Sequence, residues 1–190
     1  MKRPIVLLLA AVVLLPLAVR PAIATEIWIF AIFGLGLNLL LGYTGMLSFG
    51  QSTFFGSAAY VAGWLLKHYA INVFLALGIG VGVGAASAAL VGYLCVQRSG
   101  LYFIMLTFAL NQLFYFIAYQ WTSVTGGEDG MPGIPRPALA GIDFSNPLVY
   151  YCFVAALSLA ALWLMRRIVE SPPGRILQAI RENGVRAEAG

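Results

Sequence analysis

Long apolar segments separated by short polar stretches make up most of the chain. A membrane core about 30 Å thick requires ~20 apolar residues per helix, and several stretches approach or exceed that length without one Lys, Arg, Asp or Glu. Because strand-like alternation of polar and apolar residues is absent, the pattern predicts an all-α, polytopic membrane fold rather than a barrel. The predicted membrane helices number about six, at residues 5–22, 27–41, 47–66, 71–96, 101–121 and 148–165.

The first of these segments has two interpretations. Lys2 and Arg3 precede an apolar run that ends in Ala22-Ile23-Ala24, and this pattern also fits a cleavable signal peptide. We expect the segment to be retained as a membrane helix. Cleavage would leave five spans and place the new amino terminus outside the cell.

Composition excludes a water-soluble domain. Hydrophobic residues make up 61% of the sequence and charged residues 9%, against about 45–50% and about 25% in a soluble domain. Charged residues are too few to cover a surface that faces water. The outer face of the protein must therefore contact lipid. Cys95 and Cys152, the only cysteines, lie inside predicted spans and indicate neither a disulfide framework nor a metal site.

The net charge of +4 reflects membrane orientation rather than binding to nucleic acid, because the basic residues are scattered without interleaved aromatic residues. Basic residues gather on the cytoplasmic side of membrane proteins. A cytoplasmic amino terminus puts most of the eleven basic residues inside. The cytoplasmic ones would be Lys2, Arg3, Arg98, Arg166, Arg167, Arg175, Arg181 and Arg186, and the external ones Arg20, Lys67 and Arg136.

Several polar side chains fall inside the predicted spans. Between the second and third spans only Gly42-Tyr43-Thr44-Gly45 intervenes, which predicts a broken or re-entrant backbone next to a polar run. Polar groups at membrane depth need partners, either along a water-filled path or through local bonds to the helix backbone that serve packing alone. The candidates for a substrate path are Asn38, Ser48, Gln51, Thr53, Asn111 and Gln112.

Two further segments have a clear local pattern. The fourth span carries small residues spaced four apart from Gly78 to Gly92, which predicts a close helix packing seam. The longest loop, residues 122–147, is rich in Gly and Pro and predicts an ordered extracytoplasmic loop. Its adjacent Glu128 and Asp129 are interpreted as solvated charges in preference to a cation site.

The carboxy-terminal segment predicts a short amphipathic helix after Arg166-Arg167. Ser171 is expected to cap this helix, Pro172 to begin it and Asn183-Gly184 to end it. The pattern alone allows the helix either to dock onto a protein or to lie on anionic lipid. Its apolar face consists of Ile176, Leu177 and Ile180, and its polar face of Arg175, Gln178, Arg181 and Glu182.

The sequence lacks the residues of most catalytic sites. The two lysines, Lys2 and Lys67, follow Met and Leu, so the chain has no phosphate-binding loop that ends in Gly-Lys-Ser/Thr. A single histidine, His68, excludes histidine metal clusters and catalytic triads. No charged residue lies in the middle of a span, which argues against a proton-coupled carrier. We therefore expect no enzyme, no cofactor and no metal, and a transporter of this kind would need an external source of energy.

Four motifs occur in order along the chain. They are Gly42-Tyr43-Thr44-Gly45-Met46-Leu47-Ser48-Phe49-Gly50-Gln51, Ser99-Gly100-Leu101-Tyr102-Phe103, Thr125-Gly126-Gly127-Glu128-Asp129-Gly130-Met131, and Pro173-Gly174-Arg175 through Ala179-Ile180-Arg181-Glu182-Asn183. Together they resemble the motifs of branched-chain amino acid ABC importer permeases, and of their LivM-type branch in particular, and the similarity extends over essentially the whole chain. Related permeases for urea and short-chain amides share much of the pattern, so they remain an alternative for the substrate.

The resemblance implies a multi-pass permease subunit in the bacterial inner membrane. Its partners would be a second homologous permease subunit, two cytoplasmic ATPase subunits, an extracytoplasmic substrate-binding protein and the lipid bilayer. Residues 171–190 would form the cytoplasmic coupling loop that docks into the ATPase. The coupling residues implied by the motif are Gly174, Arg175, Ile176, Ile180, Arg181 and Glu182.

The chain departs from the family pattern in two respects. Members of the family continue through further spans, so residues 1–190 are expected to form a single but incomplete transmembrane domain. Pro173 stands where an aromatic residue is common, and Gly184 where a glutamate is common. The competing interpretations are a secondary carrier or channel and a membrane scaffold without transport activity. Neighbouring genes for an ATPase and a binding protein would favour the importer.

Overall fold

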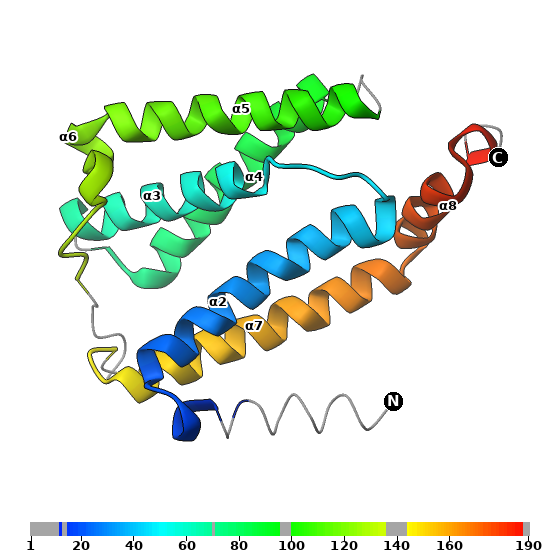
Figure 1. Cartoon of the computed structure of the whole chain (residues 1–190). Coiled ribbons are helices and arrows are strands. Elements are labelled where there is room, and N and C mark those ends of the chain that lie inside the picture. The colour runs from blue at the N-terminus through cyan, green and yellow to red at the C-terminus, as the bar shows by residue number, and fades with distance from the viewer. Residues whose placement is uncertain (1–11, 13–14, 70, 96–99, 136–143, 188–190) are drawn as a thin grey trace. The chain divides into compact units, whose positions relative to one another are not determined.

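The computed structural model describes residues 12, 15–69, 71–95, 100–135 and 144–187, and each regular element there is helical, which confirms the all-α prediction (Figure 1). The helix η1 is a π-helix and η2 a 3-10 helix. The elements are α2 (Pro21–Asn38), η1 (Leu39–Thr44), α3 (Gln51–Tyr69), α4 (Val73–Cys95), α5 (Leu101–Gln120), α6 (Thr122–Thr125), η2 (Gly127–Asp129), α7 (Pro147–Glu170) and α8 (Pro172–Ala187).

The chain divides into two compact units. The first consists of residues 1–44 and 140–190 and contains α2, η1, α7 and α8. The second consists of residues 45–139 and contains α3, α4, α5, α6 and η2. The candidate coupling helix lies in the first unit, and the candidate substrate-path cavity lies in the second.

In the first unit, α2 and α7 lie side by side (Figure 1). Trp28 donates a hydrogen bond from Nε1 to the Tyr151 hydroxyl at 3.0 Å, and Ser158 donates to the Trp28 carbonyl at 3.1 Å. Ala24 is fully buried beside them and allows α7 to approach α2 closely. Because these polar groups are buried and paired, they fix the register of the two helices as well as filling the core.

In the second unit, α3 and α4 pack through small residues. A Cβ atom added at Gly80 would lie 2.9 Å from the Ala58 carbonyl oxygen, and one added at Gly84 would lie 3.2 Å from the Phe54 carbonyl oxygen. The predicted packing seam is therefore confirmed on this face. An added Cβ at Gly78, Gly82 or Gly92 has nothing within 4 Å, so the seam does not include those glycines.

The second membrane helix begins six residues earlier than the sequence predicted, at Pro21 instead of Ile27. Proline is favoured in the first turn of a helix because its backbone angle is preset and its missing N–H has no helical partner there. Glu26 lies on the second turn of α2 and is exposed, so the helix includes this charge without burying it. The possible cleavage signal Ala22-Ile23-Ala24 lies within the first turns of α2.

By length and composition, four of the described helices could cross a membrane: Pro21–Thr44, Val73–Cys95, Leu101–Gln120 and Pro147–Glu170. The predicted sixth span ended at Met165, whereas α7 continues to Glu170, because arginines are favourable in the last turns of a helix. The predicted third span corresponds to α3, which is less apolar than those four. Of the predicted first span, residues 5–22, half lies outside the described residues.

The expected interruption between the second and third spans is present. Residues 45–50 are not helical, and Gly45 has a φ of 71°, a conformation that favours glycine. The helix that follows therefore starts at Gln51, not at Leu47 as predicted. The backbone of this segment is held by the second unit, since the Phe49 N–H donates to the Thr107 hydroxyl at 3.3 Å.

Candidate functional site

A cavity of about 1130 Å³ lies in the second unit between α3 and α5. Its walls are mainly aromatic and aliphatic side chains, with polar groups at a few positions. Pockets of this kind hold small molecules through apolar contact and a few hydrogen bonds. The residues that line it include Ser52, Thr53, Ser57, Tyr60, Trp64, Ile79, Asn111, Gln112, Phe114, Tyr115, Tyr119, Trp121, Thr125 and Glu128.

The polar groups at one part of this cavity are joined across two helices. The Asn111 side-chain oxygen, on α5, accepts hydrogen bonds from the Ser52 hydroxyl at 2.8 Å and the Thr53 hydroxyl at 2.9 Å, both on α3. Two donors on one amide oxygen orient the amide. This cluster therefore presents polar groups to an otherwise apolar cavity in a set geometry.

At another part of the cavity the loop after α5 supplies an acidic group. The Tyr119 hydroxyl donates to a Glu128 carboxylate oxygen at 3.2 Å, and both residues line the cavity. Thr125 is buried, and its hydroxyl donates to the Trp121 carbonyl at 2.9 Å and accepts from the Gly127 N–H at 3.2 Å. Residues 119–130 are thus joined by local hydrogen bonds, while residues 136–143 lie outside the described residues.

The structure brings together only some of the predicted path residues. Thr53, Asn111 and Gln112 line the same cavity. Ser48 is buried elsewhere in the unit, where its hydroxyl accepts from the Gly50 N–H at 3.2 Å, which is the local packing role considered as the alternative. Gln51 does not line the cavity, and Asn38 belongs to α2 in the first unit.

Sequence reasoning missed most of the aromatic wall. Tyr60 and Trp64 follow Thr53 at intervals of seven and eleven residues on α3, and Tyr115 follows Asn111 by four on α5. Residues at such spacings share one helix face. A search for aromatic residues on the same helix face as each polar candidate would have found this wall. Aromatic residues are common in membrane helices, however, so the sequence alone gave no reason to select these ones.

A second candidate region is the corner between α7 and α8 in the first unit. An added Cβ at Gly174 would lie 2.3 Å from the Val169 carbonyl oxygen and 2.4 Å from that of Ile168. Only glycine fits this approach, so the first turn of α8 is pressed against the last turn of α7.

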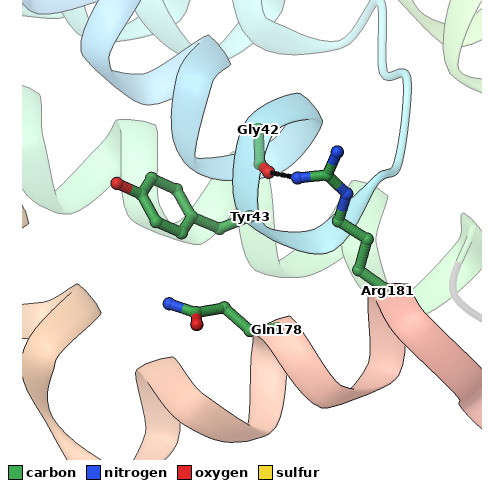
Figure 2. Close-up of a pocket in the computed structure, with 4 residues that line it drawn as sticks. All are labelled: Gly42, Tyr43, Gln178 and Arg181. Atoms are coloured by element: carbon green, nitrogen blue, oxygen red, sulfur yellow. Dashed lines mark hydrogen bonds between the residues drawn. The ribbon is translucent and has the colours of Figure 1, made fainter.

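The coupling residues predicted on α8 differ in their environments. Gly174 is buried, whereas Arg175 and Ile176 are exposed, Ile176 to 58%. Gln178, predicted on the polar face, is half-buried and lines a small cavity with Gly42, Tyr43 and Arg181 (Figure 2). The side chains of Ile180 and Glu182 lie outside the described residues.

The ends of α8 differ from the sequence prediction in two details. The helix starts at Pro172 as predicted, but the Ser171 hydroxyl donates back to the Ile168 carbonyl on α7. The helix also continues through Asn183-Gly184 to Ala187. One interior glycine costs a helix only about 1 kcal/mol relative to alanine, so it favours a stop without enforcing one.

Comparison with known proteins places the chain among membrane transport components. Residues 21–190 match the family described as "Branched-chain amino acid transport system / permease component". Two curated relatives are named "High-affinity branched-chain amino acid transport system permease protein LivM", one from Salmonella typhimurium and one from Escherichia coli. Each is 28% identical in an alignment 186 residues long, and the alignment covers 86% of this chain. No solved structure gives a significant match.

The alignments cover 44% of the length of each relative. The chain thus spans less than half the length of the curated relatives that it matches. Within that span the family match includes both the α3–α5 cavity and the whole of α8.

Proposed function

The chain belongs to the family of permease components of branched-chain amino acid transport systems, and from this premise we propose that it forms part of the transmembrane permease of a binding-protein-dependent ABC importer. The importer takes up branched-chain or related amino acids across the bacterial inner membrane. The family match over residues 21–190 is the observation that carries the proposal. The names of the two relatives favour amino acids over urea or short amides as substrate.

The proposed partners are those that the family resemblance implies. Two separate cytoplasmic ATPase subunits supply the energy, in keeping with the lack of a Gly-Lys-Ser/Thr loop for ATP in residues 1–190. A second permease subunit completes the membrane pathway, and an extracytoplasmic binding protein delivers the substrate. In this proposal the chain has no catalytic residue. It forms part of the substrate path and transmits the movement of the ATPase subunits to the membrane helices.

Reconstitution tests the proposal as a whole. The intact permease that contains these residues, its partner permease, the ATPase pair and the binding protein are placed in liposomes, and uptake of labelled leucine is followed with and without ATP on the ATPase side. We expect uptake that requires both ATP and the binding protein, with urea and acetamide as poor competitors. Uptake without ATP would identify a secondary carrier, and preferential uptake of urea would assign the other substrate class.

The α3–α5 cavity is the proposed part of the substrate path within this chain. Its aromatic wall matches the aliphatic side chain of a branched amino acid, while the Asn111 cluster and Glu128 offer partners for the polar backbone groups of that molecule. A path with a few polar contacts lets the substrate enter without holding it tightly. Selectivity then rests mainly on the binding protein.

Replacing Asn111 with leucine is expected to lower uptake about tenfold or more, because the change removes the acceptor shared by the Ser52 and Thr53 hydroxyls and leaves Ser52 only its longer bond to the Phe49 carbonyl at 3.4 Å. The measurement is the initial rate of leucine uptake, normalised to permease abundance in the membrane. Gln120→Leu, at the exposed end of the same helix and outside the cavity, is the matched control. Equal loss in both variants would remove the cavity from the path.

A further inference from the structure

The helix α2 ends in an unusual turn. From Leu39 to Thr44 the backbone is π-helical, with wider hydrogen-bonded rings than the α-helix before it. Such turns are rare and occur often at functional sites. An added Cβ at Gly42 would lie 2.4 Å from the Asn38 side-chain oxygen, so a larger residue there would displace the Asn38 side chain. Directly after the turn the chain enters the non-helical segment 45–50 that leads to α3.

An arginine side chain joins the coupling helix to this turn. Figure 2 shows Arg181 extending from α8, with its guanidinium donating a hydrogen bond to the Gly42 carbonyl. The two residues are 139 positions apart in the sequence. Beside this bond Gly42, Tyr43, Gln178 and Arg181 line a cavity of about 510 Å³, and the backbones of α8 and η1 lie next to each other.

The other end of α8 is fixed independently. Gly174 is pressed against the last carbonyls of α7, and α7 is held to α2 by the buried bonds of Trp28 with Tyr151 and Ser158. In the described part of the chain, α8 is thus joined to α7 at Gly174, and the Arg181 bond is the hydrogen bond that links it to the π-turn. Without that bond, packing alone would hold this end of α8 to the π-turn.

We propose that Arg181 is a positioning residue that joins the coupling helix to the π-turn at the end of α2, so that α8, α7 and the π-turn move as one body. The proposal rests on the proposed function, in which an ATPase displaces α8. Arg181 thereby transmits the displacement to the backbone that precedes segment 45–50, in addition to the transmission through α7. In this role its contact with the ATPase is secondary to its bond within the chain.

Arginine suits this position for two physical reasons. The carbonyls at the carboxyl end of a helix carry partial negative charge, and a cation bound to them is stabilised by the helix dipole. The guanidinium is planar and permanently charged, and it presents several N–H donors in a fixed geometry. Lysine provides one flexible charge, so Arg181→Lys should preserve the attachment only in part.

The first experiment measures the attachment itself and needs no partner protein. In the intact permease with Cys95 and Cys152 replaced, Tyr43→Cys and Gln178→Cys are combined, and their cross-linking by a short bifunctional maleimide is followed in membranes. Adding Arg181→Met should lower the yield several-fold, and Arg181→Lys should lower it less. Arg175→Met, at an exposed arginine of the same helix, should leave it unchanged. Equal yields with Arg181→Met and Arg175→Met would overturn the proposal even if the protein is a working importer.

The second experiment asks whether the attachment transmits work. Arg181→Met should lose about tenfold or more of uptake at equal membrane abundance, as expected for loss of a charge-assisted hydrogen bond. Cross-linking Tyr43→Cys to Gln178→Cys should restore uptake to that variant. If the cross-link instead abolishes uptake in protein with Arg181 intact, the two elements must separate during the cycle, and the single-body proposal is wrong.

Discussion

Gly174→Ala is expected to lower both ATPase co-purification and substrate uptake at least tenfold, although alanine normally favours a helix over glycine by about 1 kcal/mol. The reason is steric. The new Cβ would stand 2.3 Å from the Val169 carbonyl oxygen and 2.4 Å from that of Ile168, and neither backbone atom can move without unwinding the last turn of α7. Uptake, ATPase pull-down and membrane abundance are measured in the same preparation.

The same substitution at Gly78 is the control. Gly78 lies in α4, and an added Cβ there has nothing within 4 Å. Gly78→Ala should therefore retain uptake within about twofold, because only the small gain in helix propensity remains. If Gly174→Ala behaved like Gly78→Ala, the close corner between α7 and α8 would not be needed for coupling.

Ile176→Asp is expected to remove the ATPase from the purified complex while leaving the permease in the membrane. Ile176 is 58% exposed on α8, so a charge is tolerated in the free chain. At a docked surface the carboxylate would have to leave water unpaired, at a cost of several kcal/mol. Ile180, one turn further along the same predicted face, should respond in the same way. Co-purification and substrate-stimulated ATP hydrolysis are the measurements.

Ile176→Leu, which keeps the volume and the apolar character, should bind the ATPase normally. Normal ATPase binding by Ile176→Asp would contradict docking through this face. In that case α8 should bind vesicles of anionic lipid and lose that binding on the same substitution, as an interfacial helix does. The two substitutions therefore separate a protein-docking helix from a lipid-surface helix.

The sequence by itself determined the class and the family of this protein. Charge-free apolar stretches predict membrane helices because lipid penalises every unpaired polar group, and that penalty depends on composition along the chain, not on distant contacts. Thus α4 and α5 lie close to their predicted bounds. The missing phosphate-binding loop, the single histidine and the order of the four motifs are likewise local properties of the sequence, and they sufficed to predict an importer permease.

Only the tertiary structure decided which of the polar candidates act together. Ser48 and Thr53 belong to one polar run, yet Ser48 closes a local turn while Thr53 meets Asn111 at a cavity. Helical periodicity relates residues within a few turns, whereas a cavity depends on how separate helices cross. The bond from Arg181 to the Gly42 carbonyl joins residues 139 positions apart. No local sequence pattern predicts this contact, because the packing of α7 on α2 brings the two residues together.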